Sequence, residues 1–254
     1  MNQIERKKYI LDLLDSERAV RINELSKNLK VTRETIRRDL YSLEDEGSIK
    51  KVHGGAILEN TSGEIDYNQR KIEKWSEKES IAKAAVQYIE EGDSIYLDYG
   101  TTTLALAKEI VKLKNITVIT NTIPIINTLV KNQNIDLIIP GGVVRNNEAS
   151  LFGQFAMNNI CDIFITIGFF GGSGIDSKAG ITSHHMGEVL VSKQMINQSQ
   201  TTIFLADQSK FGNIAFNRTA NFDDIDILIT DKLLSDGYDY SYLNDSGVEL
   251  VVST

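Results

Sequence analysis

The spacing of apolar residues changes near residue 60, and this change constrains the fold more than any other feature of the sequence. Before it, apolar residues such as Ile22, Leu25 and Leu29 recur at the spacing of amphipathic helices. After it, short β-rich runs such as Ser94–Leu97 alternate with helical patterns such as residues 102–111. The sequence therefore predicts a small helical head followed by an α/β body.

The body carries enough strand and helix patterns for a complete open sheet. Further strands are expected at 116–120, 135–139, 163–167, 202–205, 225–230 and 248–252, and further helices at 77–90 and 188–198. This alternation predicts a doubly wound, mostly parallel α/β domain with both faces covered. The small polar run 59–66 is typical of a linker. We therefore expect a head at residues 1–58, a linker at 59–74 and an α/β domain at 75–254.

The charge is distributed unevenly. The chain has a net charge of −8, yet residues 1–60 carry 12 Lys/Arg and 11 Asp/Glu, a balance of +1. An acidic body with a neutral-to-basic head favours a protein that contacts DNA with one end only. The single cysteine, Cys161, lies in an apolar run, so we expect a buried thiol and no internal disulfide. With polar first residues and no apolar run of roughly 18 residues, the expected location is the cytoplasm.

The third helical pattern of the head has the features of a DNA-reading helix. Thr32 suits its N-cap, and Ile36, Leu40 and Leu43 form one apolar stripe. The residues that point away from this stripe or flank it are Arg33, Glu34, Thr35, Arg37, Arg38 and Tyr41. A capped helix with arginines near its start can read base edges in the major groove. The alternative is a small three-helix interaction domain whose arginines form a solvated face.

A short wing is expected directly after this helix. Ile49 and Val52 are flanked by Lys50, Lys51 and His53, and Gly54-Gly55 can form a turn. This pattern resembles a two-stranded hairpin beside the helix. Lys51 and His53 would then lie near the phosphate backbone of DNA.

Residues 32–56 carry two sequence blocks, TIRRDL and HGGA, at a separation that resembles the signature of the DeoR family of bacterial sugar-metabolism regulators. The resemblance implies that Thr32 to Arg38 form the reading end of the recognition helix. It also implies that Arg33 and Glu34, at positions that vary in the family, help to set the operator sequence.

The strongest local feature of the body is a strand followed by a glycine and three hydroxyl residues. Ser94–Leu97 leads to Gly100, and Thr101, Thr102 and Thr103 open the next helix. Backbone N–H groups and hydroxyls at a helix N-terminus bind phosphate or another anion. The alternative is an ordinary strand–helix turn with threonine capping.

Other polar or glycine residues follow the remaining strands, and in an open α/β sheet these strand ends line one edge, where ligands bind. They are Asp98, Thr120, Asn121, Gly141, Gly142, Gly168, Asp207 and Lys210. Lys210 can pair with a phosphate or hydroxyl, and Asp98 can hold a sugar hydroxyl or orient the loop. The alternative for Asp207 and Lys210 is a pair of surface charges.

Residues 75–254 resemble the DeoR-family effector domain, which is similar in fold to ribose-5-phosphate isomerase. The resemblance implies a phosphorylated sugar at Gly100–Thr103, Thr120-Asn121, Gly141-Gly142 and Lys210, and it places Glu188 at a usually acidic position. The chain departs from the family pattern at Phe169-Phe170, which would reshape the pocket, and at His184-His185. Adjacent histidines without a Cys/Asp cluster do not make a metal site, so we expect no metal and no cofactor.

Two functional classes remain to be separated, a regulator and a sugar-phosphate isomerase with an appended head. Isomerisation needs a general base, and residues 168–174, after the fourth strand, contain no carboxylate; Asp176 is the first acid reached. The sequence therefore favours binding without catalysis. We expect a repressor of a sugar-metabolism operon, a homo-oligomer (dimer or tetramer) that binds double-stranded operator DNA, and no membrane partner.

Overall fold

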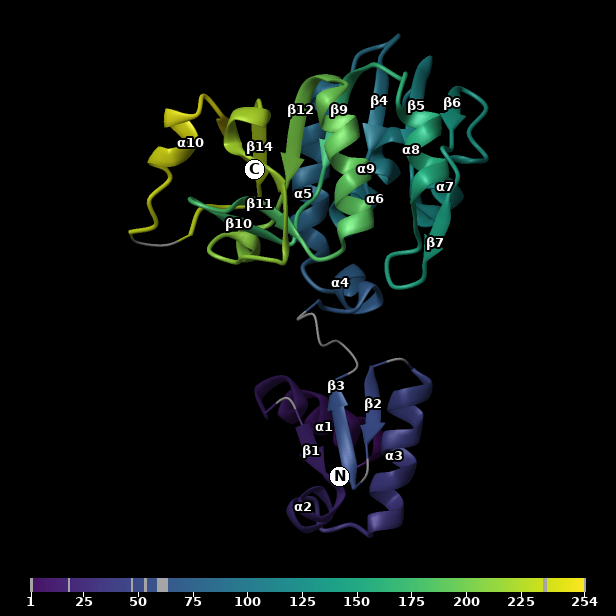
Figure 1. Ribbon diagram of the computed structural model, residues 1–254, viewed down its shortest axis with the longest axis vertical. Helices are drawn as coiled ribbons and strands as arrows, with labels where there is room; N and C mark the ends of the chain where they lie inside the picture. Colours follow the sequence, from purple (N-terminus) through teal and green to yellow (C-terminus); the bar gives the residue numbers. More distant parts are fainter. Residues whose placement is uncertain are drawn as a thin grey trace. The chain divides into compact units, whose positions relative to one another are not determined.

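The chain divides into two compact units, Met1–Asp66 and Tyr67–Thr254 (Figure 1). The computed structural model describes residues 2–17, 19–46, 48–52, 54–58, 64–234 and 237–253. The boundary falls inside the linker expected at 59–74. Residues 67–72 form a helix of the second unit, because Tyr67 is buried in the core of that unit. The expected linker is therefore too long at its C-terminal end.

The first unit packs three helices against a small antiparallel sheet. Its elements are α1 (Gln3–Glu17), β1 (Ala19–Arg21), α2 (Ile22–Asn28), α3 (Arg33–Asp45), β2 (Ile49–Val52) and β3 (Gly55–Leu58). The strand order is β1-β3-β2, so the expected two-stranded wing gains a third strand, β1, from before α2. A Cβ at Gly55 would lie 2.0 Å from the Val20 carbonyl oxygen, so glycine permits this close approach of β3 to β1.

The second unit is built on a seven-stranded parallel sheet. In chain order its strands are β4 (Ser94–Leu97), β5 (Ile116–Thr120), β6 (Ile135–Ile138), β9 (Ile165–Phe170), β12 (Ser199–Leu205), β14 (Ile227–Thr230) and β15 (Glu249–Val252). Their spatial order is β15-β14-β12-β9-β4-β5-β6. From β4 the chain adds β5 and β6 on one side and then returns to place β9 on the other side. The carboxyl ends of β4 and β9 therefore form the point where strand order reverses, which is where ligands bind in open parallel sheets.

Helices cover both faces of this sheet. One face is covered by α5 (Trp75–Ala85), α6 (Thr101–Ile110) and α7 (Ile123–Leu129), and the other by α8 (Gln154–Ile160), α9 (Met186–Asn197) and α10 (Ser241–Asp245) (Figure 1). The unit also contains α4 (Tyr67–Ile72) and the 3₁₀ turns η1 (Val86–Tyr88), η2 (Gln208–Lys210) and η3 (Phe222–Asp224). The buried side chains form one core on each face, as the doubly wound prediction requires.

Two small sheets lie outside the main one, and the sequence pattern did not predict them. The hairpin of β7 (Val143–Arg145) and β8 (Ser150–Phe152) follows β6, and β10 (Gly174–Asp176), β11 (Gly180–Ser183) and β13 (Asn217–Ala220) form an antiparallel sheet after β9. The hairpin follows the edge strand β6, and the strands of the antiparallel sheet follow β9 and β12. Both therefore add chain at the carboxyl edge of the main sheet.

Three expectations about single positions are corrected. Gly168 lies inside β9, not at its end, in a place where a Cβ would lie 2.3 Å from the Phe170 ring and 2.4 Å from Ser199 Oγ. Phe169 and Phe170 are fully buried in the cores of opposite sheet faces, because successive strand side chains alternate, so they do not shape a pocket. Cys161 is exposed, because α8 ends at Ile160 and Cys161 follows it at the surface. No helix among the described residues has the length and apolar character needed to cross a membrane.

Candidate functional site

The outer face of α3 carries the residues expected to read DNA. Thr32 caps the helix by accepting a hydrogen bond from the Thr35 N–H at 3.2 Å. Ile36, Leu40 and Leu43 are buried beneath it, as the apolar stripe predicts. The side chains exposed on its outer surface are Thr32, Arg33, Glu34, Arg37, Arg38 and Tyr41, with Thr35 half-buried. Arg37 Nη1 lies 3.5 Å from Glu34 Oε2, a contact between two exposed side chains that DNA can displace.

The wing lysine Lys51 is tied to α3 within this unit. Its Nζ lies 2.7 Å from Glu44 Oε2 and 3.2 Å from the centroid of the Tyr41 ring. The hydrogen bond to Glu44 raises the pKa of Lys51. Lys51 therefore joins the wing to α3, whereas the neighbouring Lys50 is exposed and has no ionic partner in the described chain. His53, the other wing residue expected near DNA, lies outside the described residues.

A buried ion pair beneath α3 is a structural feature that the sequence analysis missed. Asp39 is 1% exposed, and Arg6 from α1 donates to both of its carboxylate oxygens at 2.8 and 3.2 Å. Asp39 belongs to the TIRRDL block, so that block contains outward-facing arginines and an inward-facing anchor. The available signal was the position of Asp39 beside the apolar residue Leu40, which indicates that Asp39 lies close to the buried side of the helix.

The second unit contains a cleft at the carboxyl ends of β4, β9 and β12, where strand order reverses. The residues that line it are Arg70, Lys78, Tyr99, Gly100, Thr101, Thr102, Thr103, Glu148, Gly171, Gly172, Ser173, Ser183, Leu205 and Lys210. Five of these were expected at an effector site: Gly100, Thr101, Thr102, Thr103 and Lys210.

The N-terminus of α6 forms one wall of the cleft. Gly100 is its N-cap, with φ 124°, a backbone conformation that favours glycine. Thr103 Oγ1 donates to the Gly100 carbonyl at 3.0 Å, which holds the first turn. The N–H groups of a first helical turn have no acceptor within the helix, so this wall presents donors and the positive end of the helix dipole.

Three cations from separate elements line the cleft. Arg70 lies on α4, Lys78 on α5 and Lys210 on η2. Lys78 Nζ donates to the backbone carbonyls of Arg70 and Glu73, and burial lowers the pKa of Lys78 to about 8. Burial also lowers the pKa of Lys210, and no described residue accepts a hydrogen bond from its ammonium group.

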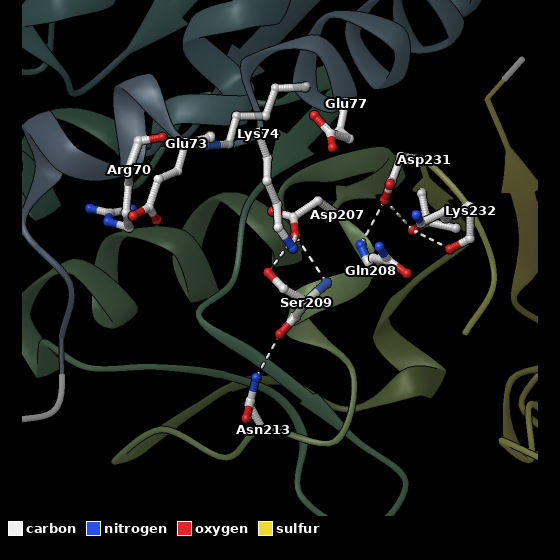
Figure 2. A network of polar contacts seen from close by, with 12 residues as sticks. Arg70, Glu73, Lys74, Glu77, Asp207, Gln208, Ser209, Asn213, Asp231 and Lys232 are labelled. Carbon is white, nitrogen blue, oxygen red and sulfur yellow. Dashed lines mark hydrogen bonds and ion pairs between the residues drawn. The ribbon is translucent and has the colours of Figure 1, made fainter. Parts of the chain in front are cut away.

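Beside the cleft, Asp207 connects the end of β12 to the start of α5. Figure 2 shows Lys74, from the junction of α4 and α5, facing Asp207, with Ser209 bonded to the same carboxylate. Lys74 Nζ lies 3.4 Å from Asp207 Oδ1, and Lys74 adopts a left-handed conformation with φ 51°. Burial raises the pKa of Asp207, but Lys210, Ser209 and Lys74 outweigh it, so the net pKa is lowered. Asp207 is thus a buried anion that holds α4, α5 and η2 around the cleft.

Four residues expected at the effector site lie at the end of β5 or after β5 and β6, and they do not line the cleft. Thr120 and Asn121 are fully buried: Thr120 Oγ1 donates to the Leu97 carbonyl at 2.8 Å and Asn121 Nδ2 to the Leu151 carbonyl at 3.2 Å. Gly141 and Gly142 turn the chain with φ 74° and 125°. Asn121 thus joins the end of β5 to the β7–β8 hairpin, whereas Thr120 joins β5 to β4. Both residues lie to one side of the point where strand order reverses.

Asp98 and Glu188 are also buried and form a polar network outside the cleft lining. Tyr96 Oη donates to Asp98 Oδ1 at 3.1 Å and Ser192 Oγ to Asp98 Oδ2 at 2.8 Å. Burial raises the pKa of Asp98 to about 7, against the opposing hydrogen bonds. Glu188 accepts hydrogen bonds from Arg145 at 2.6 Å and from Ser150. Like Gly168 inside β9, Asp98 and Glu188 were expected at the effector site and do not line the cleft.

The two adjacent histidines take structural positions. His185 caps α9, its Nδ1 accepting from the Glu188 N–H at 3.3 Å, and its ring lies 4.7 Å from that of Phe152. Neither His184 nor His185 lines the cleft. In the described part of the chain no group of three His, Cys, Asp or Glu side chains is placed to hold a metal ion.

Several residues that line the cleft were not predicted from the sequence. Arg70 and Lys78 lie in the segment assigned to the linker and the first helix, and no local pattern marks them as binding residues. Glu148 lies in the loop of an unpredicted hairpin. Gly171-Gly172-Ser173 follow β9 at its carboxyl end, so a correct end for that strand was the signal that would have found them.

Comparison with known proteins agrees with this arrangement. A family model described as the DeoR C terminal sensor domain matches residues 73–232, and one described as the DeoR-like helix-turn-helix domain matches residues 6–62. The HTH-type transcriptional regulator GolR of Listeria innocua is 34% identical over all of both chains. The HTH-type transcriptional repressor GlcR of Bacillus subtilis is 34% identical over 100% of this chain and 97% of its own. The Glycerol-3-phosphate regulon repressor of Escherichia coli is 30% identical over 91% and 92%.

Among solved structures, a D-ribose-5-phosphate isomerase in complex with phospho-erythronic acid is similar with a TM-score of 0.40 and 18% identity, over 53% of this chain and 52% of that one. The two family models together span both units, and the relatives align along nearly the full chain. The chain therefore belongs to the DeoR family of transcriptional regulators, with an N-terminal helix-turn-helix domain and a C-terminal sensor domain.

Proposed function

We propose that this protein represses an operon of sugar metabolism and that a phosphorylated sugar bound in the cleft controls it. The names of two relatives, a Glycerol-3-phosphate regulon repressor and the repressor GlcR, support this assignment. The observation that carries it is the convergence of the α6 N-terminus with Lys210, whose ammonium group has no hydrogen-bond acceptor in the described chain. A phosphate satisfies both groups at once.

The DNA-binding part of the proposal rests on α3. Its exposed arginines suit base edges and phosphates, and a two-fold oligomer presents two such helices to a palindromic operator. The effector acts by binding more tightly to an arrangement whose heads no longer match the half-site spacing. Most contacts of such a complex are to phosphates, so operator affinity falls as salt rises.

We propose binding without turnover. Residues 168–174 contain no carboxylate, and the described carboxylate that lines the cleft, Glu148, is ion-paired with Arg70. An isomerase needs a base that removes a proton from a substrate carbon, and the role that we assign to Glu148 is that of a hydrogen-bond acceptor. Turnover of ribose 5-phosphate by the purified protein would contradict this part of the proposal.

A thermal-shift screen of the full-length protein tests the sensor. The panel contains sugar phosphates and their unphosphorylated parents, and a ligand at one hundred times its Kd raises the free energy of unfolding by about 2.7 kcal/mol. We expect shifts from phosphorylated compounds only. Lys210→Ala should abolish them, whereas Lys232→Ala, at an exposed lysine after β14, should retain them. Equal shifts from the unphosphorylated parents would overturn the phosphate site.

An operator-binding assay tests the head. Arg37→Ala removes a guanidinium from the exposed face of α3, so operator affinity should fall about 10- to 100-fold while effector binding stays unchanged. Lys8→Ala, at an exposed lysine of α1, is the matched control. Operator affinity that is equal in the Arg37 variant and the wild type would mean that another surface reads DNA.

A further inference from the structure

Glu148 is a buried carboxylate with one oxygen unused. It lies in the loop between β7 and β8, is 1% exposed and lines the cleft. One of its oxygens, Oε1, is ion-paired with Arg70 of α4. The other, Oε2, accepts no hydrogen bond from any described residue. Leaving such an atom without a donor is unfavourable, so a ligand group that donates to it gains affinity.

The loop that carries Glu148 is fixed from both sides. In β8, which follows it, the Leu151 N–H donates to the Asn121 carbonyl at 2.6 Å, and Ser150 donates to Glu188. Arg145 in β7, which precedes it, donates to the same Glu188 at 2.6 Å. The carboxylate of Glu148 is therefore positioned before a ligand arrives, which lowers the entropic cost of binding.

The charges of the cleft define what can donate to Glu148. The described lining contains three cations, Arg70, Lys78 and Lys210, and one carboxylate, Glu148. Its net charge is therefore +2 when all four groups are ionised. One phosphate dianion, with a charge of about −1.5 to −2, neutralises this balance. A second phosphate or a carboxylate on the ligand would exceed it and would be repelled by Glu148. A cationic donor would add to the surplus of positive charge, which leaves a neutral hydroxyl as the matching donor.

We propose that Glu148 accepts a hydrogen bond from a hydroxyl group of the effector and selects monophosphorylated polyhydroxyl compounds over phosphorylated acids and bisphosphates. This inference rests on the proposed function and deepens it, because it names the class of compound that the cleft takes. The phosphate binds at the α6 N-terminus and Lys210, and the hydroxyl binds at Glu148. Glu148 is thus a specificity-determining residue of the sensor.

The test is calorimetric titration of the full-length protein with two matched series of probes. The three-carbon series is glycerol 3-phosphate, n-propyl phosphate and 3-phosphoglycerate. The six-carbon series is sorbitol 6-phosphate, n-hexyl phosphate and 6-phosphogluconate. Inorganic phosphate is titrated as well. In at least one series the wild-type protein should bind the polyol phosphate about tenfold more tightly than the alkyl phosphate and the acid. This comparison needs no variant, so it does not depend on how a substitution folds.

Glu148→Gln then isolates the carboxylate. It should weaken the polyol phosphate about tenfold, leave the alkyl phosphate and inorganic phosphate within about twofold, and strengthen the acid. Glu109→Gln, at an exposed ion pair in the last turn of α6, is the control and should change none of these affinities.

Two outcomes overturn the inference. They are a wild-type protein that prefers the polyol phosphate in neither series, and a Glu148→Gln variant that weakens all probes equally, as a purely structural role predicts. If no phosphate compound binds at all, the proposed function itself fails, which is a different result from binding without discrimination.

Discussion

Lys78 is a cleft residue whose pKa is lowered toward neutral pH. It is 4% exposed, and burial lowers its pKa to about 8, while Asp207 acts to raise it and Lys210 and Arg70 lower it further. A phosphate in the cleft favours the charged form of Lys78. The site therefore takes up part of a proton when the ligand binds near pH 8.

Effector affinity is predicted to fall as pH rises through the pKa of Lys78. The second pKa of a phosphate monoester is about 6, so above pH 7 the ligand keeps a constant charge and the protein alone titrates. Between pH 7 and pH 9.5 the affinity for the sugar phosphate found in the screen should fall about tenfold. Calorimetry in buffers of different ionisation enthalpy should show proton uptake at pH 8.

Lys78→Met separates this effect from the titration of Lys210. Methionine keeps the length of the side chain and removes the charge, so the variant should bind more weakly at pH 7 and lose most of the pH dependence. A wild-type affinity that is constant from pH 7 to pH 9.5 would contradict the prediction. A pH dependence of effector affinity that is equal in Lys78→Met and the wild type would also contradict it, because the titration of Lys210 would then be the cause.

At the scale of elements, α3 depends on a contact that does not touch DNA. Asp39 faces inward and joins α3 to Arg6 of α1, while Arg37 and Arg38 face solvent. Asp39→Asn removes the charge that pairs with a mostly buried guanidinium, so the free energy of unfolding of this unit should fall by about 1–3 kcal/mol. Hydrogen–deuterium exchange of the full-length protein should be faster in α1 and α3 and unchanged in α5 and α6. Asp45→Asn, at an exposed site on the same helix, is the control.

The sequence predicted elements best where one pattern sufficed. Strands β4 and β5 lie at the expected residues, because a short buried apolar run bounded by polar residues is unambiguous. The expected strand 163–167 lies two or three residues before β9, because a strand end was expected at Gly168, which packs inside the strand against Phe170. The β7–β8 hairpin was missed, because its strands are three residues long and carry no clear alternation.

The candidate site was also predicted in part, where a local sequence pattern marks its residues. The α6 N-terminus was found because its glycine and threonines are contiguous. Arg70 and Lys78 were not found, because only the folded chain brings them beside Lys210, far away in sequence. Thr120 and Asn121 do lie at the end of a strand, as expected. They bond to β4 and to the β7–β8 hairpin and do not line the cleft, which forms where strand order reverses.

At the scale of the whole molecule, the proposed effector cleft includes α4, the first helix that follows the helix-turn-helix unit. α4 begins at Tyr67, directly after the unit boundary, and carries Arg70, which contacts Glu148 in the cleft. A ligand that engages Glu148 changes the environment of Arg70 and so of α4. The chain connection at Asp66–Tyr67 is therefore the shortest covalent route from effector to head.

This connection yields a prediction about coupling. In the wild-type protein the effector should change operator affinity by about 5- to 150-fold, and operator should change effector affinity by the same factor. Six Gly/Ser residues inserted between Asp66 and Tyr67 form a flexible segment, so each ligand should still bind alone while the coupling factor approaches one. The same insert in the exposed turn between Gln133 and Asn134 should leave coupling intact. Operator titrations with and without effector measure the factor. Full coupling in the Asp66–Tyr67 variant would mean that the effector acts through subunit contacts and not through α4.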